Sequence, residues 1–210
     1  MPEILVLGVG PGSAGFLPPS IMEQAYTCDV LIGGRRNLEL FKDLPQEKRE
    51  LKGDVSSLVE HIKSSYTNKK VGILVSGDPG LFSLMRALKR YFPSQDLKAF
   101  PGISAVQYLF ARLTLSWEDA IVVSLHGRER KDLVELLKAS SKVGIFTDRE
   151  HTPSHVCQFL LNNGMDDKWI FIGENLSYPD ERIISGQPRE LVNKNFSELN
   201  VVIVVDKEVN

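Results

Sequence analysis

Three short glycine-rich segments contain the residues best suited to chemistry. Residues 8–12 (GVGPG), 76–80 (SGDPG) and 101–105 (PGISA) each follow an apolar run. Glycine lets a backbone approach a ligand closely, while Asp78 and Ser104 add a carboxylate and a hydroxyl that can bind one. If the apolar runs are parallel strands, all three segments leave the same edge of one sheet, where α/β proteins bind ligands. The sequence therefore predicts one small-molecule site formed by all three.

The first glycine segment has two alternative interpretations. Residues 10–15 fit the GxGxxG spacing of dinucleotide-binding loops. In that fold the loop opens directly into a helix, whereas here Pro11 removes an amide donor and residues 16–19 (FLPP) delay the helix until about residue 20. The acidic ribose ligand expected after the second strand is missing, because Asp29 precedes that strand. An NAD(P)-dependent oxidoreductase is the minority alternative, and a tight turn that needs glycine only for its conformation is as compatible with this loop alone.

Basic residues in predicted loops are candidates for binding an anionic substrate. The net charge of −2 gives no global basic field for nucleic acid or an anionic membrane, so such contacts must be local. The guanidinium fork suits carboxylates, and the arginines in loop-like settings are Arg35, Arg36, Arg128 and Arg130. His126 could act as a general base or hydrogen-bond a carboxylate. A solvated arginine or a structural histidine is the ordinary alternative for each.

The histidines and cysteines predict neither a metal site nor a disulfide. His151 and His155 are four residues apart, but Pro153 separates them, and we expect no acidic or cysteine partner nearby. Cys28 and Cys157 form no CxxC pair, which favours a reducing compartment. The chain has no signal-like start and no apolar run of about 18 residues. We expect a cytoplasmic protein with no membrane or nucleic-acid partner.

The elements that position these residues follow from the hydrophobic pattern. Short apolar runs predict strands at residues 4–9, 30–32, 71–75, 99–100, 121–124, 143–147, 169–172 and 201–205. Helical spacing occupies residues 55–62, 81–88 and 133–137. The alternation predicts the α/β class, with mixed, mostly parallel sheets flanked by helices. The pattern changes near residues 113–119, which predicts an N-terminal domain over 1–114 and a C-terminal domain over 119–210.

The glycine segments GVGPG, SGDPG and PGISA, in this order, resemble the tetrapyrrole methylases over essentially the whole chain. More specific strings resemble the branch that methylates C5 of a late corrin precursor: residues 33–36 (GGRR), 115–119 (LSWED), 124–128 (SLHGR), 173–176 (GENL) and 181–183 (ERI). The resemblance implies an S-adenosylmethionine-dependent methyltransferase, usually a homodimer, that converts (cobalt-)precorrin-6B to (cobalt-)precorrin-7 in cobalamin biosynthesis. A methylase for another ring carbon and a non-catalytic tetrapyrrole-binding protein are the alternatives.

The resemblance also implies roles for individual residues. The methyl donor would contact Pro11, Gly77, Asp78, Leu81, Ser104 and Ala105 of the first domain and Thr147 and Leu176 of the second. The tetrapyrrole would contact Arg35, Arg36, His126 and Arg128, with His126 as the one candidate for a general base. The fused decarboxylating domain of the aerobic relatives is not in this sequence, so we expect a separate protein to methylate C15. Any cobalt would arrive inside the substrate.

Overall fold

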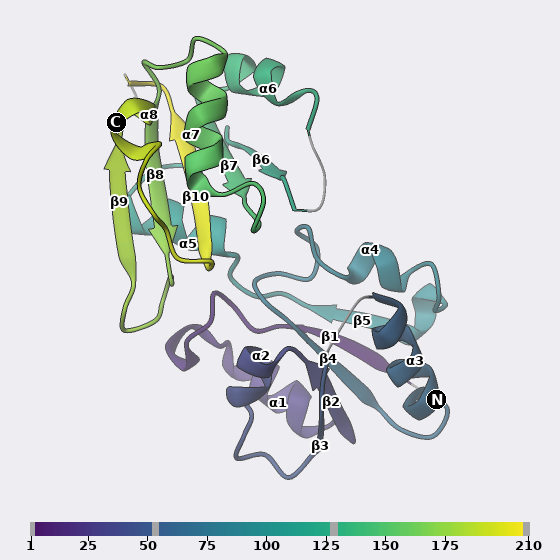
Figure 1. Ribbon diagram of the computed structural model, residues 1–210. Coiled ribbons are helices and arrows are strands. Elements are labelled where there is room, and N and C mark those ends of the chain that lie inside the picture. The colour runs from purple at the N-terminus through teal and green to yellow at the C-terminus, as the bar shows by residue number, and fades with distance from the viewer. Residues whose placement is uncertain (1–2, 52–54, 127–129, 208–210) are drawn as a thin grey trace. The chain divides into compact units, whose positions relative to one another are not determined.

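The computed structural model describes residues 3–51, 55–126 and 130–207. It divides into two compact units, Met1–Ser104 and Ala105–Asn210, and each unit is a sheet flanked by helices (Figure 1). The α/β class predicted from the alternating pattern is therefore confirmed. Within the described residues, no helix is long and apolar enough to cross a membrane.

The first unit contains a five-stranded sheet in the order β3-β2-β4-β1-β5. Its strands are β1 (Ile4–Gly8), β2 (Val30–Gly33), β3 (Glu47–Glu50), β4 (Val71–Val75) and β5 (Leu97–Phe100). Every ladder between these described strands is parallel, as the sequence predicts. The central strands β1, β2 and β4 are buried at every position, which explains why they read as continuous apolar runs.

Helices cover both faces of this sheet (Figure 1). One face packs on α1 (Pro19–Tyr26) and α2 (Arg35–Glu39), and the other on α3 (Val55–Tyr66) and α4 (Met85–Leu88). Short 3₁₀ turns span Ala14–Phe16 (η1) and Ser94–Asp96 (η2). Since side chains alternate along a strand, Leu5 and Leu7 of β1 face the first pair of helices while Ile4 and Val6 face the second.

The second unit contains a sheet in the order β6-β7-β10-β8-β9. The strands are β6 (Ile121–Ser124), β7 (Lys142–Phe146), β8 (Trp169–Glu174), β9 (Arg182–Gly186) and β10 (Asn200–Val205). The β6–β7 ladder is parallel, whereas β7–β10, β10–β8 and β8–β9 are antiparallel. The prediction of mostly parallel pairing is therefore wrong for this unit, because an apolar strand pattern does not encode strand direction.

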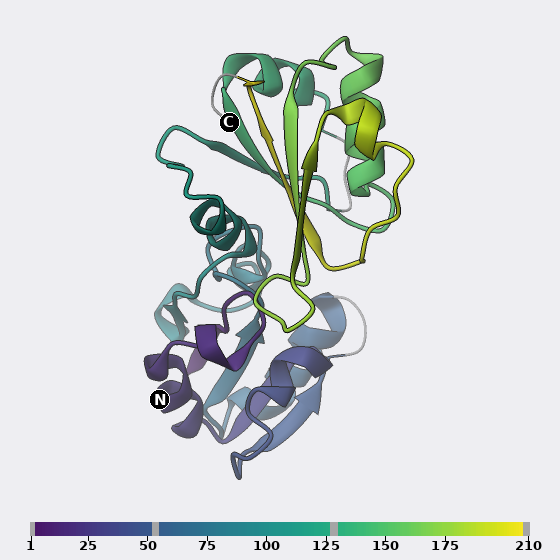
Figure 2. The same cartoon turned by 90° about the vertical axis from the view of Figure 1, so that its left-hand side faces the viewer.

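The second sheet is also covered on both faces. Helices α6 (Leu133–Ala139), α7 (Pro153–Asn162) and α8 (Pro188–Leu191) pack on one face, and Figures 1 and 2 show α7 and α8 on the same side of the strands. The other face receives α5 (Ala105–Arg112), where Val106 and Phe110 lie against Gly144. This packing places α5 in the second unit, so the structural division after Ser104 falls earlier than the sequence-based boundary at 114–119.

Both cysteines lie in apolar cores, and we expect neither to react in the folded protein. Burial raises the pKa of the Cys28 thiol to about 11 and that of Cys157 to about 12. The thiolate is the reactive form, so Ellman's reagent at about pH 8 should modify less than a tenth of either thiol until the chain unfolds in urea. Rapid reaction of one thiol in the native protein would contradict this burial.

Candidate functional site

The three glycine segments meet at one edge of the first sheet. They follow β1, β4 and β5, which are parallel neighbours in the order β4-β1-β5, so their carboxyl ends lie together. The amide of Gly77 donates to the carbonyl of Gly10 over 2.8 Å, and the amide of Val9 donates to the carbonyl of Val75 over 2.9 Å. The predicted convergence of the three segments is therefore present in the structure; we call this region the glycine junction (residues 8–12, 76–81 and 101–104).

Glycine is required in the junction because the backbones are too close for a side chain. A β-carbon on residue 102 would lie 2.4 Å from the carbonyl oxygens of both Gly8 and Gly77. A β-carbon on residue 8 would lie 2.6 Å from the amide nitrogen of Gly102. Gly10 and Gly77 also have φ angles of 81° and 68°, a region that favours glycine. Glycine at these positions therefore lets the three segments pack directly against one another through their backbones.

Asp78 fastens two of the segments together. Its Oδ1 accepts a hydrogen bond from the amide of Gly80 over 2.7 Å, and its Oδ2 accepts one from the amide of Gly102 over 3.4 Å. Asp78 does not cap a helix, because α4 begins only at Met85. The carboxylate instead stabilises the turn that leads into Leu81, whose amide donates to the Asp78 carbonyl over 3.3 Å.

Ser104 and Gly77 are also adjacent in the junction. A β-carbon on Gly77 would lie 3.3 Å from the Cα of Ser104, and Ser104 itself is buried. Ala105 follows directly as the first residue of α5, so Ser104 stands where a helix cap would stand. Pro11 is half-buried in the loop after β1. The structure therefore gathers the first-domain residues predicted to contact the donor.

Of the arginines predicted to bind the substrate, the structure describes Arg35 and Arg36 but not Arg128. Arg35 and Arg36 are exposed in the first turn of α2, not in a loop as the sequence suggested. They still follow β2, the neighbour of β4, and therefore lie at the same sheet edge as the glycine junction. Asn37 attaches this helix to the junction, since it accepts a hydrogen bond from the Ser76 hydroxyl over 3.1 Å. Arg128 lies outside the described residues.

The second unit places its predicted residues at one edge of its own sheet. Strands β6, β7 and β8 run in the same direction and end beside His126, Thr147 and Leu176. The Thr147 hydroxyl lies 2.5 Å from Oδ1 of Asn200 and Leu176 is buried. His126 is exposed, and its amide donates to the Ser124 hydroxyl over 3.3 Å.

Glu181 forms a hydrogen-bond network that the sequence analysis did not find. Its carboxylate accepts hydrogen bonds from the Tyr108 hydroxyl over 2.8 Å, from Nε of Arg112 over 2.8 Å and from the amide of Ser177 over 2.6 Å. These contacts fix the loop after β8, where Asn175 and Ser177 have φ angles of 47° and 72°. Leu176 lies between those two strained residues, so the network holds one of the predicted donor contacts in place.

Replacing Glu181 with glutamine should destabilise the protein only when the carboxylate is ionised. Burial alone would raise the pKa of Glu181, but the hydrogen bonds from Ser177, Tyr108 and Arg112 outweigh burial and lower it below the ordinary 4.5. The stabilisation is therefore complete above pH 4.5 and is lost as the pH falls through the lowered pKa. We expect urea unfolding to show a loss of about 1–2 kcal/mol at neutral pH. Glu198→Gln is the control, because Glu198 forms an exposed ion pair with Arg149, and it should change the free energy of unfolding by less than about 0.5 kcal/mol. A loss of stability in Glu181→Gln that did not depend on pH would contradict the role of the network.

The structure does not favour the dinucleotide alternative. Asp29 accepts a hydrogen bond from the amide of Lys70 over 2.7 Å, at the end where β2 and β4 begin. A ribose-binding carboxylate must lie at the opposite end, next to the glycine loop. That loop leads into the short η1 turn, and α1 begins at Pro19, as the sequence predicted.

The surroundings of His151 and His155 differ from the sequence-based expectation of no acidic partner nearby. Asp148 does provide an acidic partner, because its Oδ1 lies 3.0 Å from Nδ1 of His151, and the His151 and His155 rings are 5.2 Å apart. Pro153 lies between the two histidines as the first residue of α7, and it does not keep their rings apart. Among residues 3–51, 55–126 and 130–207, the structure has no cluster of three or more histidine, cysteine or acidic side chains that could hold a metal ion.

Comparison with known proteins identifies the family. The model of the Tetrapyrrole (Corrin/Porphyrin) Methylases matches residues 3–192. The chain is 36% identical over 206 residues to a probable cobalt-precorrin-7 C(5)-methyltransferase of Methanocaldococcus jannaschii, covering 95% of this chain and 96% of that protein. It is 32% identical over 204 residues to the cobalt-precorrin-7 C(5)-methyltransferase of Salmonella typhimurium, covering 97% and 99%. The chain therefore belongs to the tetrapyrrole methylases, as its motifs predict, and it is an S-adenosylmethionine-dependent methyltransferase.

The fold agrees with this assignment. The solved structure of a cobalamin biosynthesis precorrin-6Y methylase (cbiE) from Archaeoglobus fulgidus is 27% identical with a TM-score of 0.76, and the match covers 99% of both chains. A precorrin-6Y C(5,15)-methyltransferase [decarboxylating] of Sinorhizobium sp. is 24% identical over 188 residues, which is 87% of this chain but only 44% of that protein. That relative is about twice as long as the region it shares with this chain.

Proposed function

We propose that the chain transfers the methyl group of S-adenosylmethionine to C5 of a late (cobalt-)precorrin in cobalamin biosynthesis. The names of its relatives favour (cobalt-)precorrin-7 as the methyl acceptor over the (cobalt-)precorrin-6B that the motifs imply. The observation that carries the proposal is the convergence of three glycine segments in a chain that matches C(5)-methyltransferases over nearly its whole length. A methylase for another ring carbon is the nearest alternative within the family.

The glycine junction is our proposed site for the methyl donor. Gly77, Asp78 and Ser104 are adjacent there, and Pro11 and Leu81 flank them. The close backbone packing at Gly8 and Gly102 holds the three segments in fixed positions relative to one another, as a preformed ligand site requires. From the second unit we propose Thr147 and Leu176 as further donor contacts, and Ala105 next to Ser104.

The proposed mechanism requires alignment and no protein nucleophile. S-adenosylmethionine supplies an electrophilic methyl group on a positively charged sulfur. The junction backbone and Asp78 would hold that group in line with the attacking ring carbon and exclude water, which is where most of the rate acceleration of such a displacement can come from. A proton must leave the ring, and His126 is our candidate for accepting it, because it is exposed at the end of a strand and an imidazole nitrogen is a common proton acceptor in enzymes.

The proposal also covers the residues that bind the substrate, the oligomeric state and the partner protein. We propose that Arg35 and Arg36, exposed at the edge that carries the glycine junction, pair with substrate carboxylates together with Arg128 and His126. We further propose a cytoplasmic homodimer with no metal of its own. We also propose a separate protein that decarboxylates the ring and methylates C15; the longer Sinorhizobium relative is itself named as decarboxylating.

Two measurements test the proposal. Titration calorimetry should detect S-adenosylmethionine binding to the folded protein, and single turnover with methyl-¹³C-labelled donor should place the label on C5 by carbon NMR. Absence of donor binding would reject the methyltransferase assignment at this site. A label on another ring carbon would reject the C5 assignment alone.

A further inference from the structure

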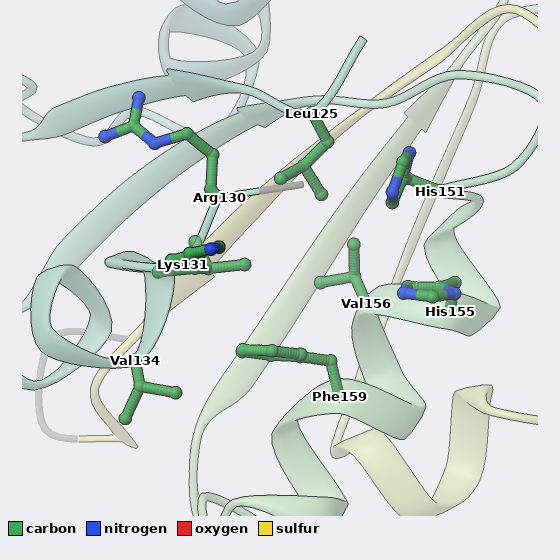
Figure 3. Close-up of a pocket in the computed structure, with 9 residues that line it drawn as sticks. Leu125, Arg130, Lys131, Val134, His151, His155, Val156 and Phe159 are labelled. Carbon is green, nitrogen blue, oxygen red and sulfur yellow. The ribbon is translucent and has the colours of Figure 1, made fainter. Parts of the chain in front are cut away.

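A small cavity in the second unit is distinct from the glycine junction. Its volume is about 240 Å³, and it is bounded by residues that precede and begin α6 and by the start of α7 (Figure 3). Pockets that enclose whole drug-sized ligands span about 300–1,000 Å³. A corrin macrocycle therefore cannot enter this cavity, whereas a short side chain of such a ring can.

The lining combines an apolar floor with basic groups. Val156 and Phe159 of α7 contribute apolar surface, and His151, His155 and Lys131 contribute nitrogen-bearing groups. Figure 3 shows the two imidazoles on one side of the cavity and Lys131 on the other. No acidic side chain belongs to the described lining. Such a surface suits a short alkyl chain that ends in a carboxylate.

Arg130 at the edge is held in a fixed orientation. Its Nε and Nη2 donate to the two carboxylate oxygens of Asp132 over 2.8 and 2.7 Å. This bidentate pair balances much of the Arg130 charge, so the imidazoles and Lys131 account for the anion preference that we infer.

His151 is oriented for binding by a fixed partner. Oδ1 of Asp148 lies 3.0 Å from Nδ1 of His151 and also accepts a hydrogen bond from the His151 amide over 2.6 Å. The Asp148 carboxylate at Nδ1 holds the imidazole ring in one orientation and leaves Nε2 as the ring nitrogen that can meet a ligand. The His151 side chain is only 12% exposed, so this geometry is set by the fold.

We propose that this cavity binds one carboxylate-bearing side chain of the corrin substrate, with His151 and His155 as its specificity-determining groups. The inference rests on the proposed function for the identity of the ring. It adds that the second unit recognises a free carboxylate on that ring, so an amidated ring should bind less well than its free acid.

The test compares two corrins without the methyl donor. Cobyrinic acid, whose side-chain carboxylates are free, should bind the wild-type chain, and cobinamide, whose carboxylates are all amides, should bind at least about tenfold more weakly. Since other basic residues are also proposed to bind carboxylates, the cavity's own share is the part of this difference that the cavity variants remove. His151→Ala should weaken cobyrinic acid binding about tenfold and change cobinamide binding less than twofold. Because His151 is mostly buried, His155→Ala at an exposed position provides a second variant that preserves the fold.

The controls separate this inference from the proposed function. His61→Ala removes a histidine from α3, and Arg189→Ala removes an arginine paired with Asp166; both should leave corrin binding unchanged. S-adenosylmethionine affinity should be the same in all variants, and in turnover His155→Ala should raise KM for the corrin without changing kcat. Equal binding of the two corrins, or unchanged cobyrinic acid binding in both cavity variants, would overturn the inference. Failure of the wild-type chain to bind S-adenosylmethionine would instead reject the proposed function.

Discussion

Gly102→Ala is expected to abolish measurable S-adenosylmethionine binding and to lower the free energy of unfolding by about 2–4 kcal/mol. The new β-carbon would lie 2.4 Å from the carbonyl oxygens of Gly8 and Gly77, and backbone atoms cannot move aside as a flexible side chain can. The segments after β1 and β4 would therefore separate from the segment after β5. Calorimetry and urea unfolding measure the two effects.

Gly34→Ala is the matched control for that substitution. A β-carbon on residue 34 meets nothing within 4 Å, and its φ of −64° suits any residue. We expect donor affinity within twofold of wild type and a stability change below about 0.5 kcal/mol. A Gly102→Ala protein that binds the donor as tightly as the Gly34→Ala protein would contradict the close packing of the junction.

Asp78→Ala should weaken donor binding by about tenfold to a hundredfold, the equivalent of about 1.5–3 kcal/mol for lost hydrogen bonds to a charged group. The carboxylate accepts hydrogen bonds from the amides of Gly80 and Gly102, so its removal frees the turn between Gly77 and Leu81. Asp78→Asn retains an oxygen for the Gly80 amide and should lose less affinity. Calorimetric titration with S-adenosylmethionine checks both variants.

Asp29→Ala provides the control, because Asp29 also accepts a backbone amide over 2.7 Å but lies at the opposite end of the same sheet. It should lose stability to a similar extent as Asp78→Ala while keeping its donor affinity. If the two variants lost donor affinity equally, Asp78 would have no role beyond general stability, and the proposed donor site would lose its polar anchor.

The central strands could be predicted because burial on both faces requires uninterrupted apolar sequence. The edge strands β3 and β9 could not be predicted in this way. β3 consists of Glu47–Glu50 (EKRE), whose charged side chains are partly or fully exposed, and β9 contributes Arg182–Gly186 at the other sheet's edge. The direction of the strands in the second unit could not be predicted either, because an apolar run has the same hydrophobic pattern in a parallel and in an antiparallel strand.

Helix lengths were overestimated where loop conformation overrides periodicity. The apolar spacing from Leu81 to Leu88 predicts a helix, yet only Met85–Leu88 is helical. Phe82 has a φ of 49°, which no helical residue adopts, and the turn fixed by Asp78 occupies the preceding residues. The functional turn therefore replaces the first half of the predicted helix.

The glycine junction could be predicted because parallel neighbouring strands bring their following loops together by topology alone. The Glu181 network could not, because Tyr108 lies 73 residues and Arg112 69 residues away in sequence. The Asp148–His151 pair is only three residues apart, but its orientation depends on where α7 begins. Side-chain partners of this kind follow from tertiary packing, which no local spacing encodes.

A crystal structure of the full chain with S-adenosylhomocysteine would test the account most directly. We predict that the nucleotide contacts the backbone of residues 10–12, 77–81 and 102–105. Density for the ligand away from all three segments would contradict the assignment of the glycine junction as the methyl-donor site.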